Sequence, residues 1–249
     1  MEAVRNFGSI LKREVKSYFE SPVAYVFLIA FLVLVNFLTF FMRGGYYEAR
    51  QADLRMFFDW HPWVYLFLVP AAAMRTWSEE RRSGTIELLL TLPVTTTQAV
   101  LGKFVGAWLF LGLGLALTFP IVITTYWLGD PDIGPLIGGY VGSFLLAGAY
   151  LAVGVFTSAV TRNQVISFVL SVGICLALVL AGLYPITRML ADWSVPGWFI
   201  DGLAAFSVLP HYESIQRGVI DLRDIGYFVS IMIVMLFATN LVVRNRNKA

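Results

Sequence analysis

Long runs of apolar residues constrain this chain more than any other feature of its sequence. An α-helix rises ~1.5 Å per residue, so about 20 apolar residues are needed to cross a hydrocarbon core of roughly 30 Å. Five runs reach that length, and only one of them carries a charged residue. They occupy residues 23–42, 101–128, 136–160, 164–184 and 225–243. The sequence therefore predicts an all-α polytopic membrane protein.

The composition supports this class and excludes others. Hydrophobic residues make up 58% of the chain and charged residues only 14%, whereas roughly a quarter of a soluble domain is charged. A disordered chain, a nucleic-acid binder and a secreted disulfide scaffold are all excluded. The single cysteine, Cys175, lies in an apolar run and offers neither an internal disulfide nor a metal cluster.

A sixth, weaker span is expected at residues 56–76. It is interrupted by Asp59, His61, Pro62 and Pro70. We include it because the charges sort cleanly only with an even number of crossings. One side then holds 12 Lys and Arg against six acids, a net +6, and the other holds six against ten, a net −4. By the positive-inside rule, both termini are cytoplasmic, and the expected location is the bacterial cytoplasmic (inner) membrane.

Two segments are expected to lie along the membrane surface instead of crossing it. Residues 3–20 place apolar side chains at helical spacing and basic side chains off that stripe, which predicts a cytoplasmic amphipathic helix. We divide the chain into this helix, residues 1–21, and a single transmembrane domain, residues 22–249. On the outer side, residues 185–224 are too broken to span and favour re-entrant or surface-lying helices.

The inner segment between the second and third spans has its own pattern. Four consecutive charges, Glu79 to Arg82, precede Ser83-Gly84 and a short apolar stretch that ends at Pro93. Thr95 and Gln98 then form a capping box that starts the next helix. This segment is either a docking element for another protein or an ordinary solvated loop, and composition alone favours the loop.

A search for catalytic motifs finds none. The chain has no phosphate-binding Gly-x-x-x-x-Gly-Lys-Ser/Thr loop, no His-Glu-x-x-His and no Gly-x-Ser-x-Gly. Glu79-Glu80 invites comparison with Glu-Glu-x-x-x-Arg intramembrane proteases, but Gly84 stands where the arginine is required. His61 and His211 each lack a spaced second metal ligand. We therefore expect no enzyme activity, no metal and no cofactor in this chain.

Small residues recur every four positions in two spans. Gly134, Gly138 and Gly142 begin the fourth span, and Gly102 and Gly106 begin the third. Such ridges let membrane helices approach closely. They indicate tight packing, within the subunit or against a second copy, and we favour packing within the subunit.

The segment EERRSGTIELLLTLPVTTTQAVLGKF (79–104), together with six spans and the N-terminal amphipathic helix, resembles the permeases of type-2 ATP-binding cassette (ABC) transporters. Among these, the chain is most similar to gliding-motility and copper-enzyme-maturation permeases. The resemblance implies that residues 79–92 form a coupling helix that contacts a separate ATPase, and that residues 1–21 form the connecting helix. The implied contact residues are Glu79, Glu80, Arg81, Arg82, Gly84, Thr85, Glu87, Leu88 and Leu89.

The resemblance also implies the assembly. Two permease copies and two cytoplasmic ATPase subunits would combine, with ATP and Mg²⁺ bound by the ATPase. We expect an exporter that works as a homodimer in contact with membrane lipid. One alternative is a mechanical transmitter that drives a periplasmic accessory protein without moving a substrate. A distant alternative is an intramembrane hydrolase.

Overall fold

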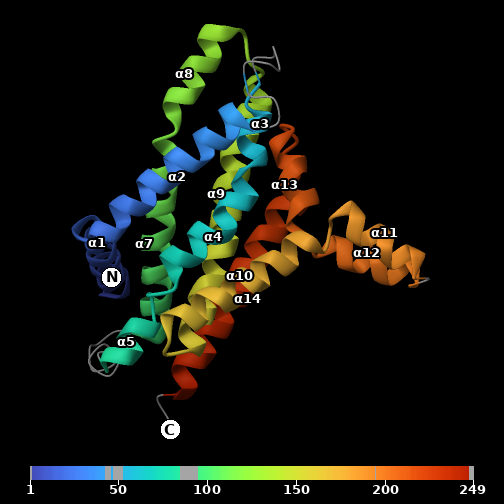
Figure 1. Ribbon diagram of the computed structural model, residues 1–249. Helices are drawn as coiled ribbons and strands as arrows, with labels where there is room; N and C mark the ends of the chain where they lie inside the picture. The colour runs from blue at the N-terminus through green and yellow to red at the C-terminus, as the bar shows by residue number, and fades with distance from the viewer. Residues whose placement is uncertain (1, 43–45, 47–52, 85–94, 194, 247–249) are drawn as a thin grey trace.

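The computed structural model describes residues 2–42, 46, 53–84, 95–193 and 195–246, and within these residues it is all-helical (Figure 1). The helices, in chain order, are α1 (Glu2–Glu20), α2 (Pro22–Phe41), α3 (Arg55–Asp59), α4 (His61–Ala73), α5 (Ser78–Ser83), α7 (Thr96–Ala116), α8 (Phe119–Leu128), α9 (Ile133–Val160), α10 (Gln164–Leu180), α11 (Tyr184–Asp192), α12 (Gly197–Ala205), α13 (Val208–Gln216) and α14 (Leu222–Arg246). The predicted fold class is confirmed.

Helix α9 is the centre of the bundle. It packs against α4, α7, α10, α13 and α14, and 83% of its most apolar 18-residue window is buried. Its glycines, alanines and serines allow this crowding, because small side chains let neighbouring backbones approach. By contrast, only 22% of the corresponding 18-residue apolar stretch of α2 is buried, and only 17% of that of α14. Their outer faces are the surfaces available to lipid or to another chain.

The six-span expectation is not confirmed. Four helical segments are long and apolar enough to cross a membrane, at Pro22–Phe41, Thr96–Leu128, Ile133–Val160 and Leu222–Asn245. A fifth is possible if α10 and α11, bent by 70° at their junction, are counted together. The expected span at 56–76 is instead divided into α3 and α4. Helix α4 has 13 residues, about 20 Å at 1.5 Å per residue, which is short of a full crossing by itself. Helices α3 and α4 nevertheless return the chain from the far end of α2 to α5, which lies beside α1 at Lys103.

Prolines explain where the apolar runs break. Pro62 lies in the first turn of α4, Pro120 in the first turn of α8 and Pro185 in the first turn of α11. Proline fits the first turn because the backbone N–H it lacks would be unpaired there. The run 101–128 is accordingly two helices, α7 and α8, and the run 164–184 ends as a helix at Leu180.

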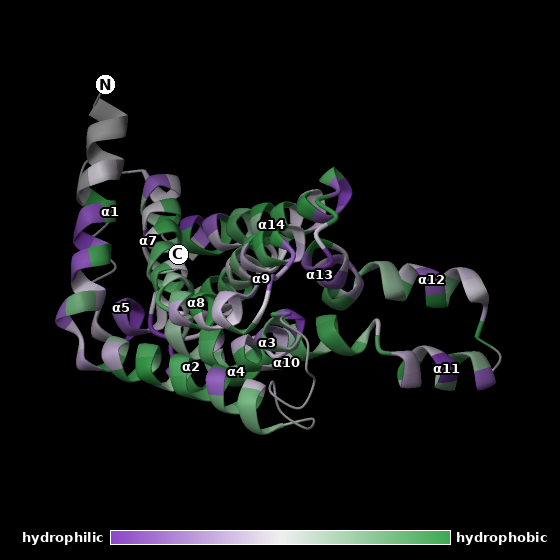
Figure 2. Ribbon diagram, turned by 90° about the horizontal axis from the view of Figure 1, so that it is seen from above, coloured by the Kyte–Doolittle hydropathy of each residue, from purple (hydrophilic) through white to green (hydrophobic). Residues whose placement is uncertain are grey.

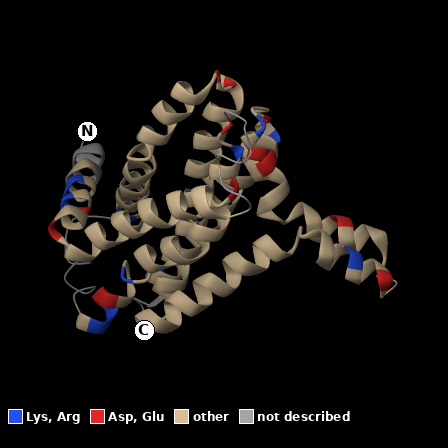
Figure 3. Ribbon diagram, turned by 45° about the horizontal axis from the view of Figure 1, so that its top comes forward, with Lys and Arg blue, Asp and Glu red and all other residues tan. Residues whose placement is uncertain are grey.

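The segment expected on the outer side is helical, with three short helices, α11, α12 and α13. Helices α11 and α12 lie side by side and project from the bundle (Figures 1 and 2), and neither contains a buried residue. Helix α13 instead packs against α9. Charged residues gather on α1 and toward the ends of the bundle, and the middle of the long helices is almost free of them (Figure 3).

Helix α1 matches the amphipathic helix expected at 3–20, and it packs against α7. The contact depends on the glycine pair of α7. A Cβ on Gly102 would lie 2.6 Å from Ile10 Cγ2, and a Cβ on Gly106 would lie 3.0 Å from Glu14 Cβ. Ser21 and Pro22 then separate α1 from α2, with Pro22 in the first turn of α2.

Candidate coupling site

The charged segment after α4 is fixed to the end of α9 by hydrogen bonds of one buried serine. The backbone N–H groups of Trp77 and Ser78 both donate to Ser158 Oγ, each at 3.0 Å. The Ser158 hydroxyl in turn donates to the Met74 carbonyl at 2.9 Å. Ser158 thus partners the backbone at the start of α5. These bonds set the direction of α5 and its rotation about its own axis.

That rotation divides the run of four charges. Glu79 and Arg82 are exposed, whereas Glu80 and Arg81 turn toward the bundle. The Arg81 guanidinium donates to the Ala159 carbonyl at the end of α9. Two of the four residues expected to contact a partner therefore have contacts within the subunit, and Glu79 and Arg82 are the two presented outward.

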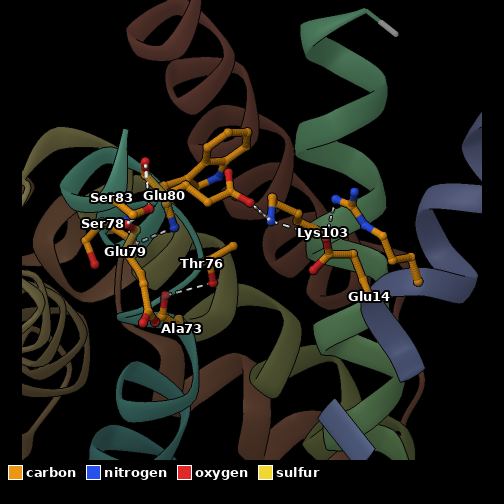
Figure 4. A network of polar contacts seen from close by, with 11 residues as sticks. Glu14, Ala73, Thr76, Ser78, Glu79, Glu80, Ser83 and Lys103 are labelled. Atoms are coloured by element: carbon orange, nitrogen blue, oxygen red, sulfur yellow. Dashed lines mark hydrogen bonds and ion pairs between the residues drawn. The ribbon is translucent and has the colours of Figure 1, made fainter. Parts of the chain in front are cut away.

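A buried lysine joins three elements at this site (Figure 4). Lys103, in the second turn of α7, has a side chain that is only 6% exposed. Its Nζ lies 2.7 Å from Glu80 Oε1 on α5 and 3.2 Å from Glu14 Oε1 on α1. It also lies 5.5 Å from the ring centroid of the buried Trp77. A single ammonium group thus connects the N-terminal helix, the charged segment and a membrane helix.

Ring stacking adds to the attachment of α1. Tyr18 stacks on Phe110 of α7, with ring centroids 4.8 Å apart and planes 14° apart. Phe27 of α2 contacts the same Phe110 ring at 5.7 Å. Because Tyr18 follows Glu14 by four residues along α1, the helix is held by a charged contact and by a ring contact one turn later.

The boundaries of the charged segment follow from local rules. Gly84 ends α5 with φ +73°, a left-handed conformation that glycine adopts without a Cβ clash. At the other side, Thr95 Oγ1 accepts from Gln98 N–H and Gln98 Oε1 accepts from Thr95 N–H. The predicted capping box is confirmed. Residues 85–94, which include Thr85, Glu87, Leu88 and Leu89, lie outside the described residues.

The two glycine ridges make contacts inside the subunit. A Cβ on Gly138 would lie 2.1 Å from the Ile215 carbonyl oxygen of α13, and one on Gly142 would lie 3.3 Å from the Ile215 side chain. Gly134 faces open space apart from Asp132. Gly102 and Gly106 face α1, as described above. In this structure the glycines hold α13 on α9 and α1 on α7.

Lys103, Glu14 and Ser158 are residues of this site that the sequence reasoning missed. Lys103 and Glu14 were used only in the count of charged residues on each side of the membrane. A lysine inside an apolar run is itself a signal, since a charge at membrane depth is costly unless it is paired. Glu14 is the only acid in the middle of the basic helix α1. Together they could have indicated the pair, although not its geometry.

Other polar groups do not assemble a site for chemistry in the described part of the chain. No group of three or more His, Cys, Asp and Glu side chains there is arranged to hold a metal. His61 lies among the rings of Phe31, Phe57, Phe58 and Tyr65. On the other side of the protein, His211 Nδ1 lies 2.7 Å from Asp224 Oδ1.

These features define a polytopic helical membrane subunit with a charged segment fixed between its helices. The comparison with known families then identifies it more closely. The chain belongs to the ABC-2 family of transporter proteins, whose family model matches residues 9–197. It is a membrane subunit of an ABC transporter and is not itself catalytic. None of the curated proteins compared with the chain matches it.

Proposed function

We propose that this chain is the permease of an ATP-driven exporter and that it takes its energy from a separate ABC ATPase docked at the segment 79–92. The family supports an ATPase partner in general. The observation that carries the specific proposal is the Lys103 network. It connects the segment that would meet the ATPase to α1 and to α7. A force applied to α5 by the ATPase would therefore be transmitted to α1 and α7.

The outward side of α5 supplies the contact chemistry. Glu79 and Arg82 present one charge of each sign beside the exposed Ser83. Charges at the centre of a protein interface contribute more than exposed charges do, because binding removes their water. Two permease copies and two ATPases, with ATP and Mg²⁺ bound by the ATPases, make up the proposed complex.

The proposed orientation places both termini and α5 in the cytoplasm of a bacterium, and α11 and α12 on the outer side of its inner membrane. The charge distribution supports this arrangement: the end of the protein that carries α1 and α5 holds most of the Lys and Arg residues.

The test is purification of the tagged chain from its native membranes, followed by mass spectrometry and an assay of ATP hydrolysis in vesicles. We expect an ABC ATPase to copurify and to hydrolyse ATP in the complex. Glu79→Lys combined with Arg82→Glu should reduce both by roughly tenfold or more, the equivalent of about 1.4 kcal/mol.

Arg188→Glu on α11 is the matched control, because it reverses an exposed charge on the other side and should change neither measurement. Absence of any ABC ATPase from the purified complex would contradict the proposal, and so would equal loss in the control and in the double variant.

A further inference from the structure

A cavity of about 460 Å³ lies where α1, α2, α4, α5 and α7 meet. This volume is within the range of small-molecule sites, roughly 300–1,000 Å³. The charged residues Arg75, Glu79 and Glu80 line one part of it, and Ala30, Leu68 and Ala72 line another. The cavity therefore has a polar part at the end of the bundle and an apolar part between the membrane helices α2 and α4.

The apolar part opens sideways. Ala24, Phe27 and Phe110 form a buried wall, exposed by 6%, 9% and 3%. Val23 and Val26 at its margin are 49% and 65% exposed and belong to the membrane helix α2. An occupant thus reaches the cavity from the hydrocarbon layer and not only from water. This geometry suits a molecule with an apolar chain and a charged head.

The charges of the polar part specify that head. Lys103 is shared by Glu14 and Glu80, and Arg13 Nη2 lies 3.4 Å from Glu14 Oε1, so these four groups balance in charge. Glu79, which also lines the cavity, supplies a further carboxylate. Arg75 is exposed and forms no hydrogen bond or ion pair with any other residue that the structure describes. A head that carries a phosphate and an ammonium complements both, since guanidinium binds phosphate in a fixed fork and carboxylates accept from N–H donors.

We infer that this cavity binds a phospholipid with a primary amine in its head, such as phosphatidylethanolamine, from the leaflet on the side of α1 and α5. The phosphate lies at Arg75, the ammonium lies toward Glu79, and one acyl chain lies between α2 and α4. The bound lipid fills the space between α1 and α4 and so stabilises α1 against the bundle. This inference requires no ATPase partner and stands or fails independently of the proposed function.

The test measures binding and thermal stability of the purified, delipidated chain in detergent. Four probes are compared. Three are lipids with the same acyl chains, phosphatidylethanolamine, phosphatidylcholine and phosphatidylglycerol, and the fourth is the chain-free head O-phosphoethanolamine. Phosphatidylethanolamine should bind most tightly and raise the melting temperature most. Phosphatidylcholine has no N–H donor and phosphatidylglycerol has no ammonium, so each should bind about tenfold more weakly, which corresponds to about 1.4 kcal/mol.

Variants locate the binding in the cavity. Arg75→Gln, at an exposed position, should weaken phosphatidylethanolamine binding about tenfold, and Arg82→Gln on α5, which does not line the cavity, should leave it unchanged. Ala72→Phe should fill the apolar part and abolish binding, whereas Ala116→Phe at an exposed site of α7 should not. Because Arg75→Gln leaves the packed core untouched, the result does not depend on the folding of Ala72→Phe.

Three results would each overturn the inference. One is equal binding of phosphatidylglycerol and phosphatidylethanolamine. Another is stabilisation by O-phosphoethanolamine as large as by the whole lipid. The third is an unchanged affinity for phosphatidylethanolamine in Arg75→Gln.

Discussion

Substitution of Lys103 by Gln should destabilise the protein more than loss of any exposed charge. The ammonium is nearly buried and lies 2.7 Å from Glu80 Oε1 and 3.2 Å from Glu14 Oε1, whereas Arg13, which also contacts Glu14, is exposed and lies at 3.4 Å. Without it, the two carboxylates remain near each other at the junction of α1, α5 and α7. Their mutual repulsion and their incomplete hydration then oppose the packing of α1.

The expected cost follows from the degree of burial. Loss of one partner from a fully buried pair costs about 3–5 kcal/mol, and exposed pairs contribute about 0–1 kcal/mol. The side chains of Glu14 and Glu80 retain 15% and 22% exposure. Water reaches them in part, so we expect a loss of about 2–3 kcal/mol in the free energy of unfolding for Lys103→Gln.

The assay is equilibrium unfolding in mixed micelles with increasing SDS, followed by circular dichroism. The control is Lys16→Gln, because Lys16 pairs with Glu20 at 3.3 Å and both side chains are exposed. It should cost less than about 1 kcal/mol. Adding Glu80→Gln to Lys103→Gln should recover part of the loss, since it removes one of the two carboxylates that have lost the ammonium.

Two results would refute this reasoning. One is a cost for Lys103→Gln no greater than that for Lys16→Gln. The other is a double variant, Lys103→Gln with Glu80→Gln, whose loss equals the sum of the two single losses, because residues that do not interact show additive effects.

Three further predictions concern packing, capping and topology. Gly138→Leu should lower the melting temperature in detergent, because the new Cβ would lie 2.1 Å from a backbone carbonyl oxygen of α13. The expected overpacking cost is about 1–3 kcal/mol or more. Gly134→Leu is the control and should be nearly neutral. Thr95→Ala should cost about 1 kcal/mol of unfolding free energy through loss of the cap, and unchanged stability would contradict its role. In a Cys175→Ala background, an impermeant thiol reagent on whole cells should label Asp192→Cys and not Ser83→Cys, and the reverse pattern would invert the proposed orientation.

The elements that the sequence predicted well are those fixed by local rules. The capping box joins residues three positions apart, and the amphipathic stripe of α1 repeats within each helical turn. Both depend on neighbours in the chain, so their patterns are visible in the sequence. The all-helical class follows in the same way from the long apolar runs.

The second span was the least certain of the six for a physical reason. Hydropathy reports whether a segment is apolar, but not whether its backbone continues through Pro62 and the break at Trp60. Helix α4 also has two kinds of apolar side chain, since Val64 and Val69 are buried in the core whereas Phe67 is 55% exposed.

The coupling site was predicted as a segment and not as a set of contacts. The four charges Glu79 to Arg82 are equivalent in sequence, and only the rotation of α5 separates the inward pair from the outward pair. Ser158, about 80 positions later in the chain, sets that rotation. Glu14 and Lys103 are likewise 89 positions apart. No local pattern indicates such contacts.

Site-specific photo-crosslinking tests the central claim, that the exposed side of α5 meets an ABC ATPase. A photoreactive amino acid is placed at Ser83 of the full-length chain, and separately at Asp192 on α11 as the control. Both positions are exposed. After irradiation of native membranes, the linked protein is identified from its peptides. We expect Ser83 to link to a protein with the phosphate-binding Gly-x-x-x-x-Gly-Lys-Ser/Thr loop and Asp192 not to do so. A Ser83 product that lacks any such protein, or an equal yield of it from Asp192, would contradict the account.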